Sequence, residues 1–111
     1  MKIPLAKCVI QPVRKMNQTE AEYDLMLRVR KQDGEVIWYD YETTKLMIGK
    51  RCWYTPDFMV MTAEGQIEFH EVKGGHIEDD AMVKFKAVQR IYPMFRFRMM
   101  QKKKGTWREV A

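Results

Sequence analysis

The sequence predicts a single α/β domain in which one β-sheet is flanked by helices. The chain has 111 residues, close to the usual size of one domain. Hydrophobic residues make up 46% of it and charged residues 32%, which allows one buried core. Hydrophobic periodicity gives the order helix, short strands, helix, strands, which is typical of α/β folds. Within residues 1–111 we expect a lead-in over 1–16 and a core over 17–111.

The first predicted helix begins after Asn17. Asn17 and Glu20 have the spacing of a capping box, in which each side chain bonds the backbone N–H of the other residue. Asp33 and Gly34 end the helix. Between these ends lies a broad apolar arc made of Ala21, Tyr23, Leu25, Met26, Leu27 and Val29.

The middle of the chain predicts four strand-like segments. Residues 36–42 and 45–48 are rich in β-branched and aromatic residues, and residues 49–53 have the composition of a turn. Residues 55–62 and 66–73 predict a hairpin, because Ala63, Glu64 and Gly65 between them are a turn signal. Gly74 and Gly75 end the second of these strands.

A second helix and two last strands are expected to complete the domain. Glu78, Asp79 and Asp80 place acids where a helix N-terminus favours them. Helix-spaced apolar residues follow as far as Pro93. Residues 95–100 and 107–110 then predict strands joined by a turn at Lys104.

The charge is uneven along the chain. The net charge is +5, and residues 96–108 contain six basic residues and no acid. A basic surface attracts polyanions such as nucleic acid, although a solvated basic end explains the run equally well. Cys8 and Cys52 are far apart, and no zinc-spaced cluster or membrane-spanning segment occurs. We therefore expect a soluble cytoplasmic protein with no membrane partner.

The residues with the clearest chemistry lie in the predicted hairpin. Side chains alternate across a strand, so Glu71 and Lys73 share a face with the apolar Ile67 and Phe69. Antiparallel pairing brings Asp57, at the start of the first strand, close to Glu71 near the end of the second. Carboxylates that repel one another at one rim of a sheet suit a hard divalent ion such as Mg²⁺.

Such an ion polarises a phosphodiester and activates water, and Lys73 would orient that water. The carbonyl of Val72, between the acid and the lysine, is a third expected ligand. The structural alternative is an ordinary Glu71–Lys73 ion pair, with Asp57 capping a strand after Pro56. Glu-x-Lys alone is common, but Pro56-Asp57 at hairpin spacing before it is more selective.

These residues resemble the signature of the PD-(D/E)XK nuclease superfamily. The match is closer to small uncharacterised phage and prophage proteins that resemble Holliday-junction resolvases. It covers nearly all of residues 17–110 and rests on Thr19-Glu20, the Tyr-Thr-Pro-Asp-Phe of 54–58, the His-Glu-Val-Lys-Gly of 70–74 and the Asp-Asp-Ala of 79–81. The resemblance implies a mixed central sheet and a Mg²⁺- or Mn²⁺-dependent phosphodiesterase site. Asp57, Glu71 and Val72 would bind the metal, Lys73 would assist the water, and Glu20 would add a carboxylate from the first helix.

Several other residues have two interpretations. Glu20 also has a purely structural one as the capping-box glutamate, and Glu22 competes with it for the site. His70 points away from Glu71 and is more typical of a structural histidine. Contacts to DNA phosphates are expected from Lys84, Lys86, Arg96, Arg98, Lys102, Lys103 and Lys104.

The sequence thus predicts a metal-dependent DNA endonuclease. A structure-selective enzyme for branched DNA in phage recombination or replication is favoured, because a chain this small has little protein for reading bases. Two cuts in a junction need two chains, so a homodimer is expected. The alternatives are a non-catalytic DNA-binding module on the same fold and a phage assembly protein whose basic strip contacts packaged DNA.

Overall fold

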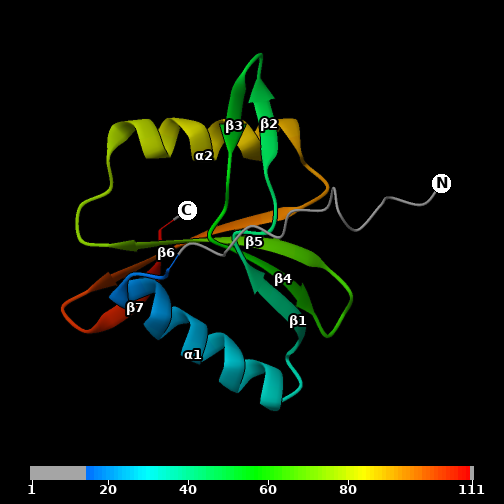
Figure 1. The fold of residues 1–111 in the computed structure, drawn as a ribbon, viewed down its shortest axis with the longest axis vertical. Helices are drawn as coiled ribbons and strands as arrows, with labels where there is room; N and C mark the ends of the chain where they lie inside the picture. Colours follow the sequence, from blue (N-terminus) through cyan, green and yellow to red (C-terminus); the bar gives the residue numbers. More distant parts are fainter. Residues whose placement is uncertain (1–14, 111) are drawn as a thin grey trace, which may run out of the picture.

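A helix covers each face of a five-stranded mixed β-sheet (Figure 1). The computed structural model describes residues 15–110, so Cys8 and the expected lead-in, apart from Lys15 and Met16, lie outside the described residues. The elements in chain order are α1 Gln18–Gln32, β1 Val36–Tyr41, β2 Leu46–Gly49, β3 Cys52–Tyr54, β4 Phe58–Thr62, β5 Ile67–Gly74, α2 Asp79–Ile91, β6 Arg96–Lys103 and β7 Thr106–Glu109.

The sheet has the strand order β1-β4-β5-β6-β7. Three of its pairings are antiparallel, and only β5 and β6 run parallel. Parallel neighbours need a long crossover, which α2 supplies between them. The predicted α/β class is confirmed, as is a central mixed sheet with helices packed on it.

Two apolar clusters hold the helices to the sheet. Tyr23 and Leu27 of α1 pack against one face, and Phe85 and Val88 of α2 pack against the other. The side-chain alternation predicted for β5 is confirmed, because Val72 belongs to the α1 cluster and Phe69 to the α2 cluster. The predicted apolar arc of α1 is wider than the buried one: the exposed fractions are 56% for Leu25, 54% for Val29 and 36% for Met26.

The segment predicted as a turn over residues 49–53 is shorter than expected. Cys52 begins β3, which pairs with β2 to form a separate two-stranded sheet. Arg51 adopts a positive φ of 57°, and this lets the chain reverse within two residues. The result is a hairpin that extends beyond α2 in Figure 1.

The remaining boundaries differ by a few residues. β4 begins at Phe58 and not at Thr55, because Pro56 has no N–H for a ladder hydrogen bond. β6 extends to Lys103, so Lys104 lies in the β6–β7 turn, whereas Lys102 and Lys103 belong to the strand. Neither helix among the described residues is long and apolar enough to cross a membrane.

Candidate active site

The residues predicted to form the site line one open pocket of about 490 Å³. The pocket lies where β4 begins, where β5 ends and where α1 starts. Its predicted members are Glu20, Asp57, Glu71, Val72 and Lys73. The other residues that line it are Asn17, Glu42, Thr55 and Gly74. The predicted convergence of residues from two strands and the first helix is confirmed as geometry.

Asp57 is fixed by a backbone hydrogen bond from the neighbouring strand. The N–H of Val72 on β5 donates to Oδ2 of Asp57 at 2.7 Å. The last residue pair of the β4–β5 ladder is Phe58–His70, so this hydrogen bond lies just beyond the end of the ladder. The N–H and C=O of one residue point to the same side of a strand, so the Val72 carbonyl also faces Asp57. This agrees with the predicted place of that carbonyl in the pocket.

Glu71 and Lys73 lie side by side on the other face of β5 from Val72. The Lys73 Nζ is 3.7 Å from Oε2 of Glu71, and the exposed fractions of the two side chains are 32% and 12%. Oε1 of Glu71 is buried and has no hydrogen-bond partner among the described residues. Lys73 therefore lies against only one oxygen of this carboxylate, and the side chains of Tyr54 and Asp57 are its other polar neighbours.

The two acids strongly perturb each other's protonation. Burial and the nearby charge of Glu71 raise the pKa of Asp57 to about 8. Burial also raises the pKa of Glu71, and Lys73 opposes that shift. Two carboxylates this close do not both ionise readily unless a cation lies between them.

Glu20 and Glu22, the two acids that competed for the site, have different surroundings. Glu20 is 3% exposed and lines the pocket; its Oε1 accepts hydrogen bonds from the Asn17 N–H and the Tyr41 hydroxyl, each at 2.9 Å. The Asn17 capping box is confirmed, so Glu20 caps α1 while adding negative charge beside Asp57. Glu22 does not line the pocket and forms an ion pair with Lys102.

The donor set fits a hard divalent cation. Carboxylate oxygens of Asp57 and Glu71 and a backbone carbonyl are the ligand types that Mg²⁺ and Mn²⁺ prefer. The unpartnered Oε1 of Glu71 and the raised pKa of Asp57 are both relieved by positive charge at this position. Residues 15–110 contain no group of three or more His, Cys, Asp or Glu side chains arranged as a ready metal centre. Water and substrate would therefore complete the coordination of an ion held here.

Sequence reasoning missed two residues of the site. Glu42 follows β1 and lines the pocket because Tyr41 pairs with Phe58, which brings the end of β1 beside Asp57. Tyr54 is buried, and burial together with the charges of Glu71 and Asp57 raises its pKa, so its hydroxyl stays protonated. The only sequence signal for Tyr54 was its place directly before Thr55-Pro56-Asp57.

His70 is built into the opposite side of the sheet. It is fully buried, with Nδ1 at 2.7 Å from the Tyr23 hydroxyl and Nε2 at 2.8 Å from Oε1 of Glu68. Burial lowers the pKa of His70, so the ring is neutral near pH 7; Nε2–H then donates to the Glu68 carboxylate, and Nδ1 accepts from the Tyr23 hydroxyl. This arrangement confirms the structural interpretation of His70.

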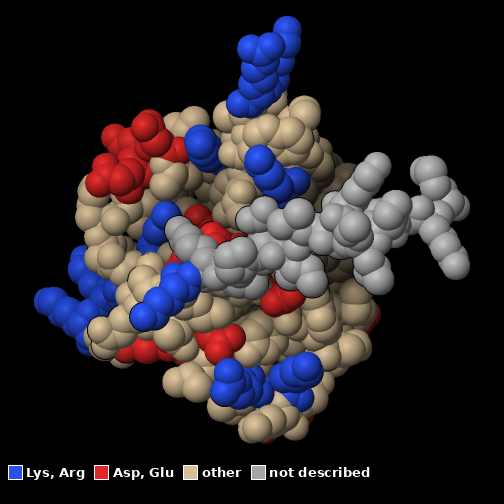
Figure 2. Space-filling model, viewed as in Figure 1, with Lys and Arg blue, Asp and Glu red and all other residues tan. Residues whose placement is uncertain are grey.

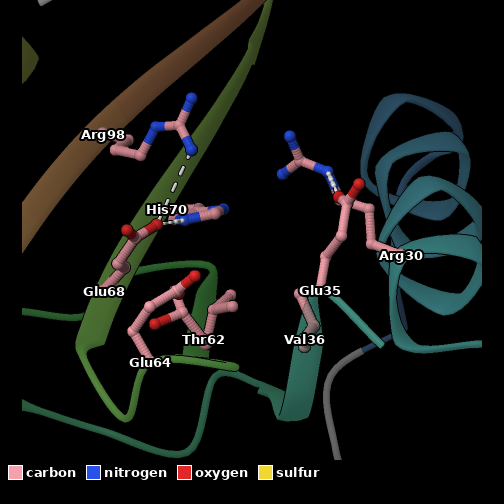
Figure 3. Close-up of a pocket in the computed structure, with 9 residues that line it drawn as sticks. Arg30, Glu35, Val36, Thr62, Glu64, Glu68, His70 and Arg98 are labelled. Atoms are coloured by element: carbon pink, nitrogen blue, oxygen red, sulfur yellow. Dashed lines mark hydrogen bonds and ion pairs between the residues drawn. The ribbon is translucent and has the colours of Figure 1, made fainter. Parts of the chain in front are cut away.

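The predicted DNA-contacting residues do not form one patch. Arg98 lies in a separate pocket beside Glu68 and His70 (Figure 3), with a nitrogen 2.9 Å from Oε1 of Glu109 and 19% exposure. Lys102 is paired with Glu22. The proposed phosphate contacts of Arg98 and Lys102 therefore compete with internal ion pairs. Lys84 lines a pocket that shares residues with the site. For Lys86, Arg96, Lys103 and Lys104 the role stays a prediction.

No protein-family model, no curated protein and no solved structure matched this chain. The resemblance to PD-(D/E)XK nucleases rests on the motif residues alone.

Proposed function

We propose that this protein is a Mg²⁺- or Mn²⁺-dependent endonuclease that hydrolyses phosphodiester bonds in DNA. The observation that carries the proposal is the meeting of Asp57, Glu71 and Val72 in one open pocket beside Lys73. A mixed sheet with a helix on each face also agrees with the architecture that the PD-(D/E)XK resemblance implies.

Each residue has a role that follows from its position. A bound divalent ion supplies a water of lowered pKa and stabilises charge that develops on the phosphate. Asp57 and Glu71 would hold that ion through their side chains, and Val72 would hold it through its carbonyl. Lys73 orients the attacking water and offsets negative charge in the transition state. Glu20, anchored by Asn17 and Tyr41, holds a further carboxylate at the pocket wall.

DNA is the proposed substrate because of the net charge of the chain and the open form of the pocket. The net charge of +5 favours a polyanion, and the site is an open pocket of about 490 Å³ and not an enclosed cavity. Figure 2 shows Lys and Arg side chains around the acidic groups on one face of the molecule. Selectivity for branched DNA, and a homodimer that cuts both strands of a junction, remain parts of the proposal that rest on the resemblance.

The rival functions explain the site less well. A non-catalytic DNA-binding module has no use for two buried acids that repel one another and also repel phosphate. A phage assembly protein that contacts packaged DNA through basic residues predicts no effect of divalent metal on stability. The raised pKa values of Asp57 and Glu71 favour an enzyme, because strongly shifted pKa values are common among the ionisable groups of active sites.

A cleavage panel tests the proposal. The purified chain is incubated with Mg²⁺ or Mn²⁺ and with a four-way junction, a flap and a linear duplex of the same sequence. We expect strand cleavage by the wild type and by Glu64→Gln, an exposed acid at the far end of the same hairpin. Asp57→Asn should abolish it, and Lys73→Ala should lower its rate by about a hundredfold or more. Binding without cleavage on every substrate and with both metals would favour the DNA-binding module.

A further inference from the structure

A second pocket, of about 310 Å³, adjoins the candidate active site. Both pockets are lined by Thr55, Glu71 and Lys73, so the two hollows share a wall that carries a predicted ligand and the predicted catalytic lysine. The second pocket extends from this wall to the β2–β3 hairpin on one side and the first turns of α2 on the other. A ligand held at Glu71 would therefore continue into it.

The lining of the second pocket differs from that of the first. Trp53 and Tyr54 supply aromatic surface, and the lining carries two charges of each sign, from Glu71, Lys73, Asp80 and Lys84. The first pocket is dominated by carboxylates and suits a cation with a phosphate. Aromatic surface beside opposite charges that balance suits a flat, hydrogen-bonding group without net charge, such as a nucleobase.

Trp53 is presented by a firmly anchored hairpin. Leu46 and Tyr54 are buried in the α2 cluster, and the Tyr92 hydroxyl donates to the Met47 carbonyl at 2.8 Å. The Trp53 side chain stays 40% exposed, and the Lys45 ammonium lies 5.0 Å from its ring centroid. Exposure of this ring to water is unfavourable in the free protein. The same exposure leaves the ring available for stacking on a base, with a cation beside it for the phosphate backbone.

The end of this hairpin adds positive charge. Lys50 and Arg51 form its turn, and both are exposed. Lys and Arg side chains stand at that end, at the top of the view in Figure 2. Nucleic acid that passes the second pocket would therefore meet cations next to an aromatic platform.

We infer that the second pocket holds the base of an unpaired nucleotide next to the scissile phosphate, with Trp53 as the stacking surface and Lys84 near the backbone. This inference rests on the proposed function for the position of that phosphate. A paired base is stacked within its duplex and cannot enter the pocket. The substrate class is accordingly DNA with unpaired nucleotides at the cleavage position, such as a single strand, a flap or an opened branch point.

Binding in the absence of metal tests the inference separately from cleavage. The affinity of the full chain for a labelled single-stranded oligonucleotide, and for a duplex of the same length, is measured by fluorescence anisotropy in EDTA. We expect tighter binding of the single strand and a loss of roughly tenfold or more in Trp53→Ala, as stacking energies predict. Trp38→Ala is the matched control, because Trp38 is 39% exposed and lines neither pocket.

A second pair of variants guards against a folding defect in Trp53→Ala. Lys84→Ala should weaken single-strand binding several-fold, whereas Lys31→Ala, an exposed lysine of α1 on the opposite side of the sheet, should not. Equal affinity for single strand and duplex, or equal effects of Trp53→Ala and Trp38→Ala, would overturn the inference. If these variants behave as expected but no metal supports cleavage, the base pocket stands and the proposed nuclease activity fails. If the chain cleaves DNA but Trp53→Ala leaves single-strand binding unchanged, the proposed nuclease activity stands and the base pocket fails.

Discussion

The backbone N–H of Val72 donates a hydrogen bond of 2.7 Å to Oδ2 of Asp57. This contact continues the β4–β5 pairing by one step after the backbone ladder has ended at Phe58 and His70. It fixes the Asp57 carboxylate beside the strand that carries Glu71 and Lys73. This hydrogen bond therefore adds to the β4–β5 ladder in holding the two halves of the candidate site together.

The pH dependence of stability should show the repulsion in the site. Asp57 has a pKa of about 8 in the folded protein against an ordinary value of 3.8, so the folded state holds its proton more tightly. Its contribution is fully present below pH 3.8 and is lost as the pH rises through about 8. In metal-free buffer the free energy of unfolding should thus fall across this window by up to about 1.4 kcal/mol per pH unit.

Urea denaturation of the wild type and Asp57→Asn at several pH values measures this effect. The amide keeps an oxygen that can accept from Val72 but loses the charge, so its stability should fall less between pH 4 and 8. The difference between the two curves isolates Asp57 from other titrating groups, such as Glu68, whose pKa is lowered by the His70 hydrogen bond. Parallel curves for the two proteins would show that no proton is held between the acids.

Gly74 should be intolerant of a side chain because of Thr19. A Cβ atom at Gly74 would lie 2.8 Å from Oγ1 and 3.4 Å from Cγ2 of Thr19 on α1. Gly74→Ala should therefore destabilise the fold by about 1–3 kcal/mol and displace the helix start that carries Glu20.

The double variant Thr19→Ala, Gly74→Ala provides the control. With both close atoms removed, the remaining contact to the Thr19 Cβ is an ordinary 3.6 Å. Thermal melts should show most of the lost stability restored in the double variant. Additive losses from the two substitutions would contradict the proposed clash.

Tyr23→Phe should weaken the fold while leaving the site unchanged. It removes the donor to Nδ1 of His70, which is fully buried, and an unsatisfied buried group costs about 1–3 kcal/mol. Tyr39→Phe should cost less, because its hydroxyl is only partly buried and its bond to the Asp24 carbonyl is 3.3 Å long. Denaturation gives both values. A large loss of metal binding in Tyr23→Phe would mean that the two faces of the sheet are coupled.

Lys73→Ala should separate chemistry from metal binding. The lysine is proposed to act on the water, so its removal should lower the single-turnover cleavage rate by about 10²–10⁴-fold. Metal affinity should change much less, although the pKa of Glu71 should rise further without its neighbour. Lys31→Ala should leave both quantities unchanged. A similar loss of metal affinity and rate would make Lys73 a support for Glu71 and not a catalytic group.

Local patterns in the sequence predicted the centre of the site. Alternation along β5 separated Glu71 and Lys73 from His70 and Val72, and turn chemistry at residues 63–65 predicted the hairpin that aligns Asp57. The capping box of Asn17 depends on residues within one turn of helix. Each of these features is decided by neighbours in sequence, so it can be read without the fold.

Features that depend on distant contacts could not be predicted in this way. Glu42 reaches the pocket only because β1 pairs with β4, and Arg98 acquires Glu68 and Glu109 only because β6 lies between β5 and β7. The second pocket needs the β2–β3 hairpin to pack on α2, and β3 itself was predicted as part of a turn. Tertiary packing determines these positions, and the hydrophobic periodicity of the sequence does not predict that packing.

The central claim is that the carboxylates of Asp57 and Glu71 together hold a divalent ion. Titration of the chain with Mn²⁺, followed by the loss of the free-ion signal in electron paramagnetic resonance, tests it most directly. Binding by the wild type and by Glu22→Gln, with loss of binding in both Asp57→Asn and Glu71→Gln, is the predicted result. Wild-type protein that binds no Mn²⁺, or retention of binding in either of the two site variants, would contradict the account.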